Sequence, residues 1–270
     1  MQAEIPLLDI SQLESDISAR VNERSLNLLY LKSCESTNKV CRQLGQHYSI
    51  VLAEQQSAGR GRRGNAWYSP SAQNIYCSIG LIKTIQAGAL GLLSLQVGVS
   101  IARVLREQGF MQVTLKWPND ILLEGKKLGG ILIETRQVSG NQFYLTIGFG
   151  LNVNLQEADF VHINQPATSL NRAAGESIHR QVLLAELIGR IINHIMEFEL
   201  HMTDALVVAF NQLDSLLGQP VLVKTGTLEI PGIHRGINQN GQIQVQTEQG
   251  IECFSAAEIS LRTSEHVTHR

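Results

Sequence analysis

The sequence is poor in paired cysteines, in charge and in long hydrophobic runs, and each shortage excludes a class of protein. The four cysteines and eight histidines form neither a C-x-x-C nor an H-x-x-x-H pair. We therefore expect free thiols in a reducing compartment and no transition metal held by the protein. The formal net charge is −2, so no overall basic field draws the chain onto nucleic acid.

Long apolar stretches are also missing. No stretch approaches the roughly 18 consecutive apolar residues of a membrane-spanning helix. The first residues, MQAEIPLLDIS, lack the apolar run of a signal peptide, so we expect a cytoplasmic protein without membrane contact. What the chain does contain is core material, because 43% of its 270 residues are hydrophobic and 17% are charged. That is enough for one large domain or for two of unequal size.

Helix and strand patterns alternate irregularly through most of the chain. Helix patterns occupy residues 9–24, 36–45, 89–108, 177–201 and 202–213. Strand patterns occupy residues 26–32, 49–56, 74–82, 113–134 and 142–154. Beyond residues 217–220 only short strands are expected, with turns at Thr225-Gly226, Asn240-Gly241 and Gln249-Gly250. This order predicts an α+β fold, a mixed sheet with helices on one face, followed by a small β barrel.

The stretch AGRGRRG at residues 58–64 places three arginines among three glycines, and the glycines match G-x-G-x-x-G. A dinucleotide-binding turn must open into a helix, which Pro70 and its polar neighbours prevent. Duplex nucleic acid requires phosphate contacts spread over an element, whereas these arginines lie close together. Glycine also costs conformational entropy without benefit to a solvated loop. The residues leave two interpretations open, a solvated basic loop and a loop that folds over one compact polyanion.

Several other motifs occur with this loop in a characteristic order. They are ESTN (35–38), W-x-S-P (67–70), KWPND (116–120), KLGGILIE (127–134), GFGLNV (148–153), GIHRGINQNG (232–241) and EISLR (258–262). Each is weak alone, but GRGRRG, KWPND and KLGGIL in this order are highly specific. Over residues 28–262 the sequence resembles the bacterial biotin protein ligases, the biotin–[acetyl-CoA-carboxylase] ligases.

The resemblance implies both a fold and a reaction. The expected domains are an N-terminal connector helix (1–25), a class II synthetase-like catalytic domain (26–217) and an SH3-like barrel (218–270). The implied reaction joins biotin and ATP, with Mg²⁺, into biotinyl-5′-adenylate. The biotinyl group then passes to one lysine of the biotin carboxyl carrier protein of acetyl-CoA carboxylase. The sequence leaves the oligomeric state open, a homodimer included.

The resemblance also assigns roles to individual residues. The expected catalytic residues are Lys127, Arg62 and Asp120. The expected biotin-binding residues are Ser36, Thr37, Asn38, Gln56, Arg60, Gly61, Arg62, Lys127 and Gly130. The expected ATP-binding residues are Arg62, Trp67, Asn119, Lys127 and Asn152. Cations suit this reaction because a carboxylate that attacks a phosphate brings two anions together.

Simpler interpretations of the same residues stay open. Ser36 or Thr37 is an ordinary helix cap by position, and Asp120 equally caps a loop. Two lysines after a hairpin glycine, as at Lys126 and Lys127, usually form a solvated turn. Asn65 stands where many relatives have another arginine, which leaves one phosphate contact open.

Two other functions compete with the ligase. Many relatives carry an N-terminal DNA-binding domain of roughly 60 residues, whereas about 25 residues precede the catalytic pattern here. We therefore expect no DNA binding and rank a DNA-binding regulator last. A lipoate ligase of similar architecture is the alternative enzyme, against which the GRGRRG loop and the C-terminal barrel argue.

Overall fold

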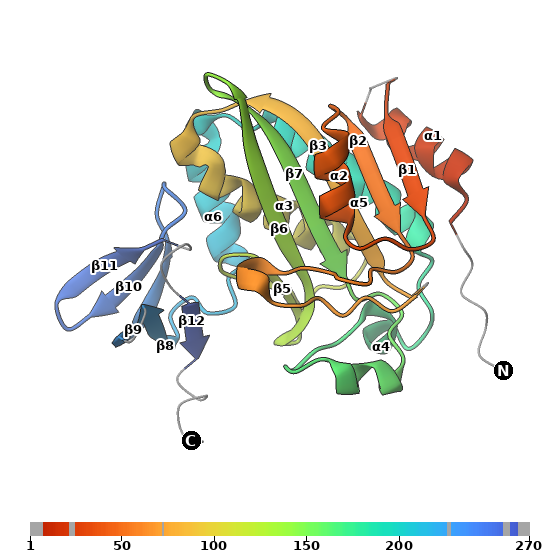
Figure 1. Cartoon of the computed structure of the whole chain (residues 1–270). Coiled ribbons are helices and arrows are strands. Elements are labelled where there is room, and N and C mark those ends of the chain that lie inside the picture. Colours follow the sequence, from red (N-terminus) through yellow and green to blue (C-terminus); the bar gives the residue numbers. More distant parts are fainter. Residues whose placement is uncertain (1–7, 22–24, 72, 226–227, 256–259, 264–270) are drawn as a thin grey trace.

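The computed structural model describes residues 8–21, 25–71, 73–225, 228–255 and 260–263. Its main body is a seven-stranded sheet in the order β1-β2-β3-β7-β6-β5-β4 (Figure 1). The strands β1 and β2 are parallel and the other neighbours antiparallel. The strands are β1 (Asn27–Leu31), β2 (Ser49–Ala53), β3 (Ile75–Thr84), β4 (Val113–Lys116), β5 (Asp120–Leu123), β6 (Lys126–Ser139) and β7 (Gln142–Leu151).

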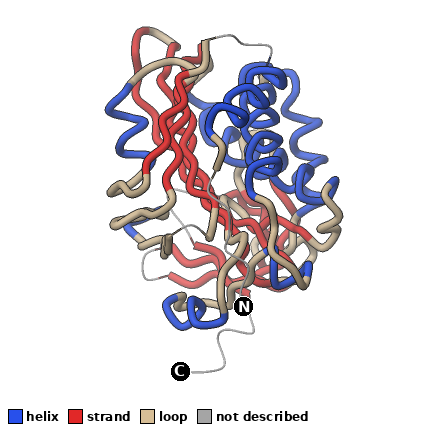
Figure 2. The backbone as a smooth tube through the Cα atoms, turned by 90° about the vertical axis from the view of Figure 1, so that its right-hand side faces the viewer, coloured by secondary structure: helices blue, strands red, loops and turns tan. Residues whose placement is uncertain are grey.

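The long helices gather on one side of this sheet, which Figure 2 shows as separate helix and strand layers. They are α3 (Leu90–Glu107) and α5 (Arg180–Glu197), with α1 (Ile10–Val21) and α6 (Thr203–Leu213) packed against them. The mixed sheet with its helical layer is the fold class that the sequence predicts. The short helix α2 (Thr37–Leu44) is different, because it lies on the opposite face, where Ser78 of β3 hydrogen-bonds to it.

The helix α3 is apolar nearly all round because it is the central core helix. Ala87–Glu107 is long and apolar enough to cross a membrane, but 67% of its most apolar window is buried inside the protein. Gly98 faces the sheet, since a Cβ there would be in ordinary contact with Leu115 at 3.5 Å and Ile131 at 3.6 Å. Packing against the sheet therefore accounts for the apolar composition of this helix.

Several predicted elements differ in detail from the structure. The helix expected from Ser177 to His201 begins at Arg180 and ends at Glu197. It begins late because Asn154 hydrogen-bonds both the backbone N–H and the carbonyl of Ile178, which keeps the preceding chain out of the helix. The helix α4 (Leu170–Ala174) and the short 3₁₀ helix η3 (Glu157–His162) are not predicted from the sequence.

The C-terminal part is a separate five-stranded antiparallel sheet in the order β11-β10-β9-β8-β12. Its strands are β8 (Pro220–Thr225), β9 (Leu228–Ile237), β10 (Ile243–Thr247), β11 (Gly250–Phe254) and β12 (Ser260–Thr263). The turns at Asn240-Gly241 and Gln249-Gly250 join its strands as predicted, whereas Gly226 lies outside the described residues.

Candidate active site

The sheet face beneath α2 carries unusually small residues. In the β3-β7-β6 ladder, Ser78 pairs with Gly148, and Gly150 pairs with Gly130. A Cβ at Gly148 would overlap Asn38 Oδ1, and a Cβ at Gly150 would lie 2.7 Å from Trp67 Nε1. The glycines therefore let one polar and one aromatic side chain lie directly on the sheet, which forms the floor of the candidate site.

One end of this floor is polar, and Thr37, Gln56 and Ser78 there are neutral. The ESTN segment leads from β1 into α2, and Cys34 forms an isolated parallel bridge with Gln56 after β2. Gln56 Oε1 accepts hydrogen bonds from the backbone N–H and the hydroxyl of Thr37, at 2.9 and 3.2 Å. Ser78 Oγ lies 2.8 Å from Thr37 Oγ1 and 2.6 Å from Asn38 Oδ1. These contacts fix short donors and acceptors at the beginning of α2.

The capping interpretation of this segment is only half right. Ser36 is the N-cap residue of α2 by backbone geometry, but its side chain makes no capping hydrogen bond. Thr37 is the first helical residue, and its hydroxyl binds Gln56 rather than a free backbone amide of α2. Asn38 donates to the carbonyl of Leu132 at 3.1 Å and to Glu134 Oε2 at 3.0 Å. The side chains of Thr37 and Asn38 thus face the sheet and the end of β2.

The other end of the floor is charged. Lys127 Nζ lies 2.8 Å from Asp120 Oδ1 and 5.7 Å from the centre of the Trp67 ring. A Cβ on Gly130 would lie 3.5 Å from Trp67, 3.8 Å from Lys127 and 4.0 Å from Asp120. The four residues therefore form one cluster, in which the lysine is 18% exposed and the aspartate 24% exposed. Both ions stay accessible enough to exchange their partner for a ligand.

A β-bulge in β6 directs the side chain of Lys127, and not that of Lys126, toward the site. The β5–β6 register shifts between Ile121 and Leu122, so that Leu122 pairs with Lys127. In a regular ladder Leu122 would pair with Leu128, and Lys127 would point to the opposite face. Lys126 is exposed. The backbone of Lys127 is also held by Pro166 and Thr168, through hydrogen bonds of 2.9 Å each.

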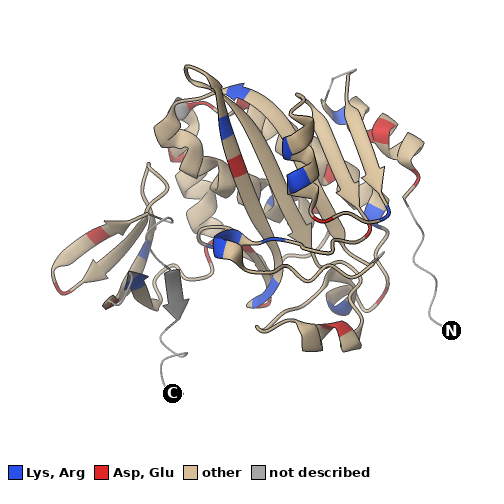
Figure 3. Cartoon of the chain, viewed as in Figure 1, with Lys and Arg blue, Asp and Glu red and all other residues tan. Residues whose placement is uncertain are grey.

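The arginine loop lies over this charged end. Figure 3 shows basic residues both on the loop and at the beginning of β6. Arg62 is partly buried, and its NH1 lies 3.4 Å from Asn119 Oδ1. Burial lowers the pKa of its guanidinium, the neighbouring Arg63 lowers it further, and Asp120 opposes both. Arg62 is therefore a partly buried cation beside Asn119 and within reach of the Asp120 charge.

The rest of the loop is held by its backbone. Gly61 N–H donates to the carbonyl of Asn65 at 2.7 Å, and Asn65 N–H donates to the carbonyl of Arg62 at 3.1 Å. Asn65 thus closes the loop through its main chain. Arg60 and Arg63 are exposed, whereas Arg62 is partly buried beside Asn119.

Two expected nucleotide-binding residues differ in their surroundings. The Trp67 indole Nε1 is buried and, among the described residues, has no hydrogen-bond partner. Asn152 is buried and its Nδ2 donates to the carbonyl of Thr168 at 3.1 Å. This bond ties β7 to the loop that holds Lys127, which favours a supporting role for Asn152.

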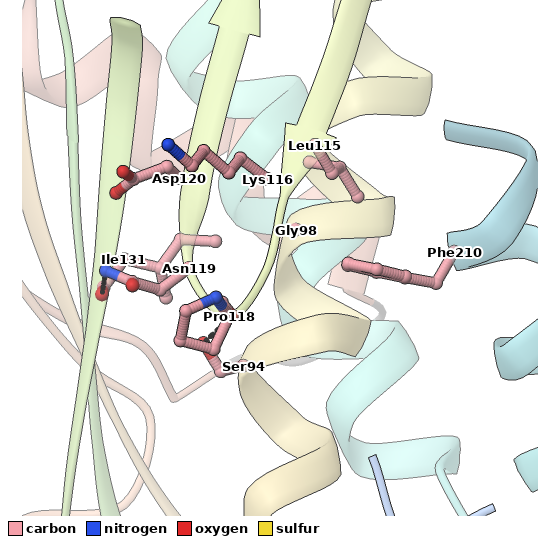
Figure 4. Close-up of a pocket in the computed structure, with 9 residues that line it drawn as sticks. All are labelled: Ser94, Gly98, Leu115, Lys116, Pro118, Asn119, Asp120, Ile131 and Phe210. Atoms are coloured by element: carbon pink, nitrogen blue, oxygen red, sulfur yellow. Dashed lines mark hydrogen bonds between the residues drawn. The ribbon is translucent and has the colours of Figure 1, made fainter. Parts of the chain in front are cut away.

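Asn119 and Asp120 form the turn from β4 to β5. Asn119 donates from Nδ2 to the carbonyl of Ile131, and its own carbonyl accepts from Ile131 N–H, each at 3.0 Å. Figure 4 shows this turn beside a small hollow that α3 and Phe210 of α6 line from behind. The turn is therefore fixed to β6 on one side and to the helical layer on the other.

Sequence reasoning misses three residues of the site, Ser78, Glu134 and Gly148. All three lie on the floor or bind Asn38 there. The available signal was a small or charged residue at alternate positions of otherwise apolar strands, as in YCSIG (76–80). The pattern shows which residues share a face, but not which helix covers it.

The fold and the site together define a ligand-activating enzyme of the ligase class, with an uncharged polar end and a basic, nucleotide-compatible end. The model of the Biotin/lipoate A/B protein ligase family matches residues 30–152, and that of the Biotin protein ligase C terminal domain matches residues 216–262. The chain belongs to the biotin protein ligase family.

Curated relatives and a solved structure agree with this assignment. The bifunctional ligase/repressor BirA of Salmonella typhimurium is 35% identical over 97% of this chain and 80% of its own length. The biotin–[acetyl-CoA-carboxylase] ligase of Paracoccus denitrificans is 29% identical over 77% of this chain and 88% of its own length. The Aquifex aeolicus biotin protein ligase, solved with biotin and ATP, superposes with a TM-score of 0.73 at 29% identity, covering 88% of this chain and 99% of that one.

Proposed function

We propose that this chain is a biotin–[acetyl-CoA-carboxylase] ligase. It activates biotin with ATP to biotinyl-5′-adenylate, releases pyrophosphate, and transfers the biotinyl group to a lysine of a biotin carboxyl carrier protein. The observation that carries the proposal is the arrangement of the floor, with neutral polar groups at one end and the Lys127–Asp120 pair at the other. A ligand with a neutral ring and an anionic tail matches that polarity.

The polar end suits the ureido ring of biotin, which has two N–H donors and one carbonyl acceptor. Thr37, Gln56 and Ser78 already exchange hydrogen bonds with one another, so their side chains are oriented before a ligand arrives. Ser36, whose side chain makes no capping bond, is an additional partner for the ring. Such preorganisation lowers the entropy cost of binding.

Lys127 is the residue that we assign to the reacting centre. Its ammonium offsets the repulsion between the biotin carboxylate and the α-phosphate, and it stabilises the charge that develops on the phosphorus oxygens. A cation about 4 Å from an anion contributes about 4 kcal/mol at an effective dielectric near 20. Asp120 orients that ammonium at 2.8 Å, and its carboxylate can accept the proton of the incoming lysine amine during transfer.

The loop residues complete the nucleotide end. Arg62, already partly buried beside Asn119, would form charge-assisted hydrogen bonds with a bound phosphate. Arg60 and Gly61 reach the ligand if the loop closes over it, and closure keeps water away from the mixed anhydride. Trp67 offers a ring to stack on adenine, with Gly130 beside it to leave space.

Mg²⁺ fits this site as a companion of ATP. The described residues contain no cluster of three or more His, Cys, Asp or Glu side chains. Mg²⁺ needs no such cluster, since substrate phosphates, water and one or two protein oxygens hold it. Asn119 and Asp120 would supply those oxygens, and the ion would neutralise phosphate charge that the protein leaves uncompensated.

The proposal also includes the acceptor protein, the absence of DNA binding, the cellular location and the oligomeric state. The acceptor is the carrier domain, and DNA is not a ligand, since the net charge of −2 provides no overall basic field. All four cysteines are free thiols, which supports a cytoplasmic location. A homodimer is compatible with the fold, and sedimentation equilibrium decides between monomer and dimer.

Biotin-dependent exchange of pyrophosphate into ATP tests the adenylation step, and labelled biotin on an isolated carrier domain tests the transfer. Lipoic acid run in parallel tests the alternative enzyme. We expect exchange with biotin and little with lipoate. Exchange with lipoate alone would show that the chain is a lipoate ligase. Tight, sequence-specific DNA binding would show that it is a DNA-binding regulator instead.

A further inference from the structure

A histidine and an aspartate outside the site described above form a fully buried hydrogen bond. His234 lies on β9 of the C-terminal sheet, and Asp214 directly follows α6. His234 Nε2 donates to Asp214 Oδ2 at 2.6 Å, and both side chains are 0% exposed. The pair therefore joins the C-terminal sheet to the end of the helical layer.

Packing alone does not account for this histidine. Its Nδ1 is buried and, within the described part of the chain, has no hydrogen-bond partner. An apolar side chain would fill the space without an unsatisfied polar atom. Asp214 Oδ1 accepts from the N–H of Leu216 at 3.0 Å, which leaves Oδ2 to the imidazole. Without His234 that buried carboxylate oxygen would lose its compensating donor.

Asp214 is in turn attached to the edge strand β4. It forms a parallel bridge with Leu115, and the N–H of the following Ser215 donates to the carbonyl of Leu115 at 2.8 Å. The last residue of β4, Lys116, pairs with Asp120 in the β4–β5 ladder. Asp214 and Ser215 therefore hold β4 at Leu115, and only Lys116 separates that contact from the turn that carries Asn119.

A second link reaches the same turn. Trp117 Nε1 donates to the carbonyl of Gly241, between β9 and β10, at 2.9 Å. Gly241 is itself packed closely on α3, since a Cβ there would lie 3.0 Å from Leu92 and 3.1 Å from Leu95. The segment 115–117 is thus held at Leu115 by Asp214 and Ser215 and at Trp117 by Gly241, two residues before Asn119.

We infer that His234 is a positioning residue for the nucleotide half of the active site. Through Asp214 and β4 it holds the β4–β5 turn, so that Asp120 meets Lys127 and Asn119 meets Arg62. The inference rests on the proposed function. The biotin end, built on β1, α2 and β3, has no such attachment to the C-terminal sheet among the contacts described. Loss of His234 should therefore change the KM for ATP and leave the KM for biotin unchanged.

Steady-state exchange kinetics of His234→Ala in the full chain test this role. We expect the KM for ATP to rise about ten-fold, a coupling typical of residues in one hydrogen-bonded network, while the KM for biotin stays within about two-fold. His234→Gln, which keeps an N–H donor, should recover most of the loss. If His234→Ala does not fold, Asp214→Asn, which keeps the shape but removes the carboxylate, replaces it.

A second pair of the same chemistry supplies the control. His201 Nδ1 lies 3.3 Å from Glu199, with the two side chains 77% and 70% exposed, and His201→Ala should change neither KM. Equal changes in both KM values, or a lower melting temperature with both values unchanged, would overturn the inference. Absence of any biotin-dependent exchange by the unsubstituted chain would contradict the proposed function instead.

Hydrogen exchange by mass spectrometry provides a readout that needs no activity. In His234→Ala, amides of the segment 113–120 should exchange faster than in the unsubstituted chain, while those of β2 stay unchanged. Unchanged exchange in the segment 113–120 would show that Asp214 and β4 do not depend on His234, and would equally overturn the inference.

Discussion

At the scale of single residues, two adjacent lysines lie in different environments. Lys127 forms the 2.8 Å ion pair with Asp120, whereas Lys126 is exposed. Both are equally basic and both follow the same hairpin glycine. The difference arises from one extra residue in β6, which turns the side chain of Lys127 onto the floor of the site.

Replacing Lys127 by glutamine should therefore reduce adenylate formation by about 10²- to 10³-fold, the usual cost of removing one group that stabilises developing charge. The circular dichroism spectrum should stay unchanged, because the side chain is not part of the core. Lys126→Gln is the matched control, with an expected effect below about two-fold. Similar rates in the two variants, measured by pyrophosphate exchange, would refute the assignment.

The floor glycines make a second prediction at this scale. Gly148→Ala places a methyl group where Asn38 Oδ1 now lies, which must displace the beginning of α2. Biotin affinity measured by calorimetry should fall about ten-fold or more, as for a buried network that loses a partner. Gly91→Ala on α3, where a Cβ meets nothing within 4 Å, should leave biotin binding unchanged and slightly raise stability. Equal biotin affinities in the two variants would contradict the placement of α2.

At the scale of elements, a buried ion pair fastens α5 to the end of β2. Arg180 NH1 lies 2.8 Å from Glu54 Oε2, and the side chains are 3% and 5% exposed. Arg180 also donates to the carbonyl of Asn74, and Tyr30 donates its hydroxyl hydrogen to Glu54. Glu54 stands two residues before Gln56, so this pair fixes the strand from which the polar end of the site begins.

Arg180→Met should destabilise the fold by about 3–5 kcal/mol, because it leaves a buried carboxylate without its partner. Urea denaturation followed by fluorescence measures the change. The double variant Glu54→Gln/Arg180→Met should recover part of that loss, since no buried charge remains. A double variant as unstable as the sum of the single ones would mean that the pair does not act as a unit.

At the scale of the whole molecule, one core joins the helical layer to the sheet. It includes Leu13 and Ile17 of α1, which are fully buried, and α1 packs along α5, where Arg20 pairs with Glu186. The helix expected as a connector thus contributes to the same core as the catalytic sheet. The ionisation of tyrosines buried in and around this core can be used to follow its unfolding.

Burial, and then a hydrogen bond to Glu54, raises the pKa of Tyr30 to about 12. Burial also raises the pKa values of Tyr76 and Tyr144. The fold therefore favours neutral phenols, and this stabilisation is complete below pH 10 and is lost as pH rises through the folded-state values.

The free energy of unfolding should accordingly decrease between pH 10 and about 12, with a smaller slope in Tyr30→Phe. Urea denaturation at several pH values, with phenolate absorbance recorded in parallel, measures it. If the phenolate absorbance that Tyr30→Phe removes appeared near pH 10 in the folded protein, the ordinary value for tyrosine, it would contradict the buried environment of Tyr30.

The order of elements and the family could be read from the sequence. Apolar periodicity placed α3 near residues 89–108, and the glycine of EGKK marked the β5–β6 hairpin, where Gly125 has φ +73°. Both features depend on neighbours along the chain. The motif order, with GRGRRG before KWPND and KLGGIL, likewise needed no folded structure.

Only the tertiary structure decided which of these residues meet. It selected Lys127 by a bulge, left Arg60 at the surface, and brought Ser78 and Glu134 to Asn38 across the sheet. It also buried His234 against Asp214, a contact between residues 20 positions apart in the sequence. Local sequence fixes backbone periodicity, whereas strand register and helix docking depend on long-range packing, so the site could be listed from the sequence but not assembled from it.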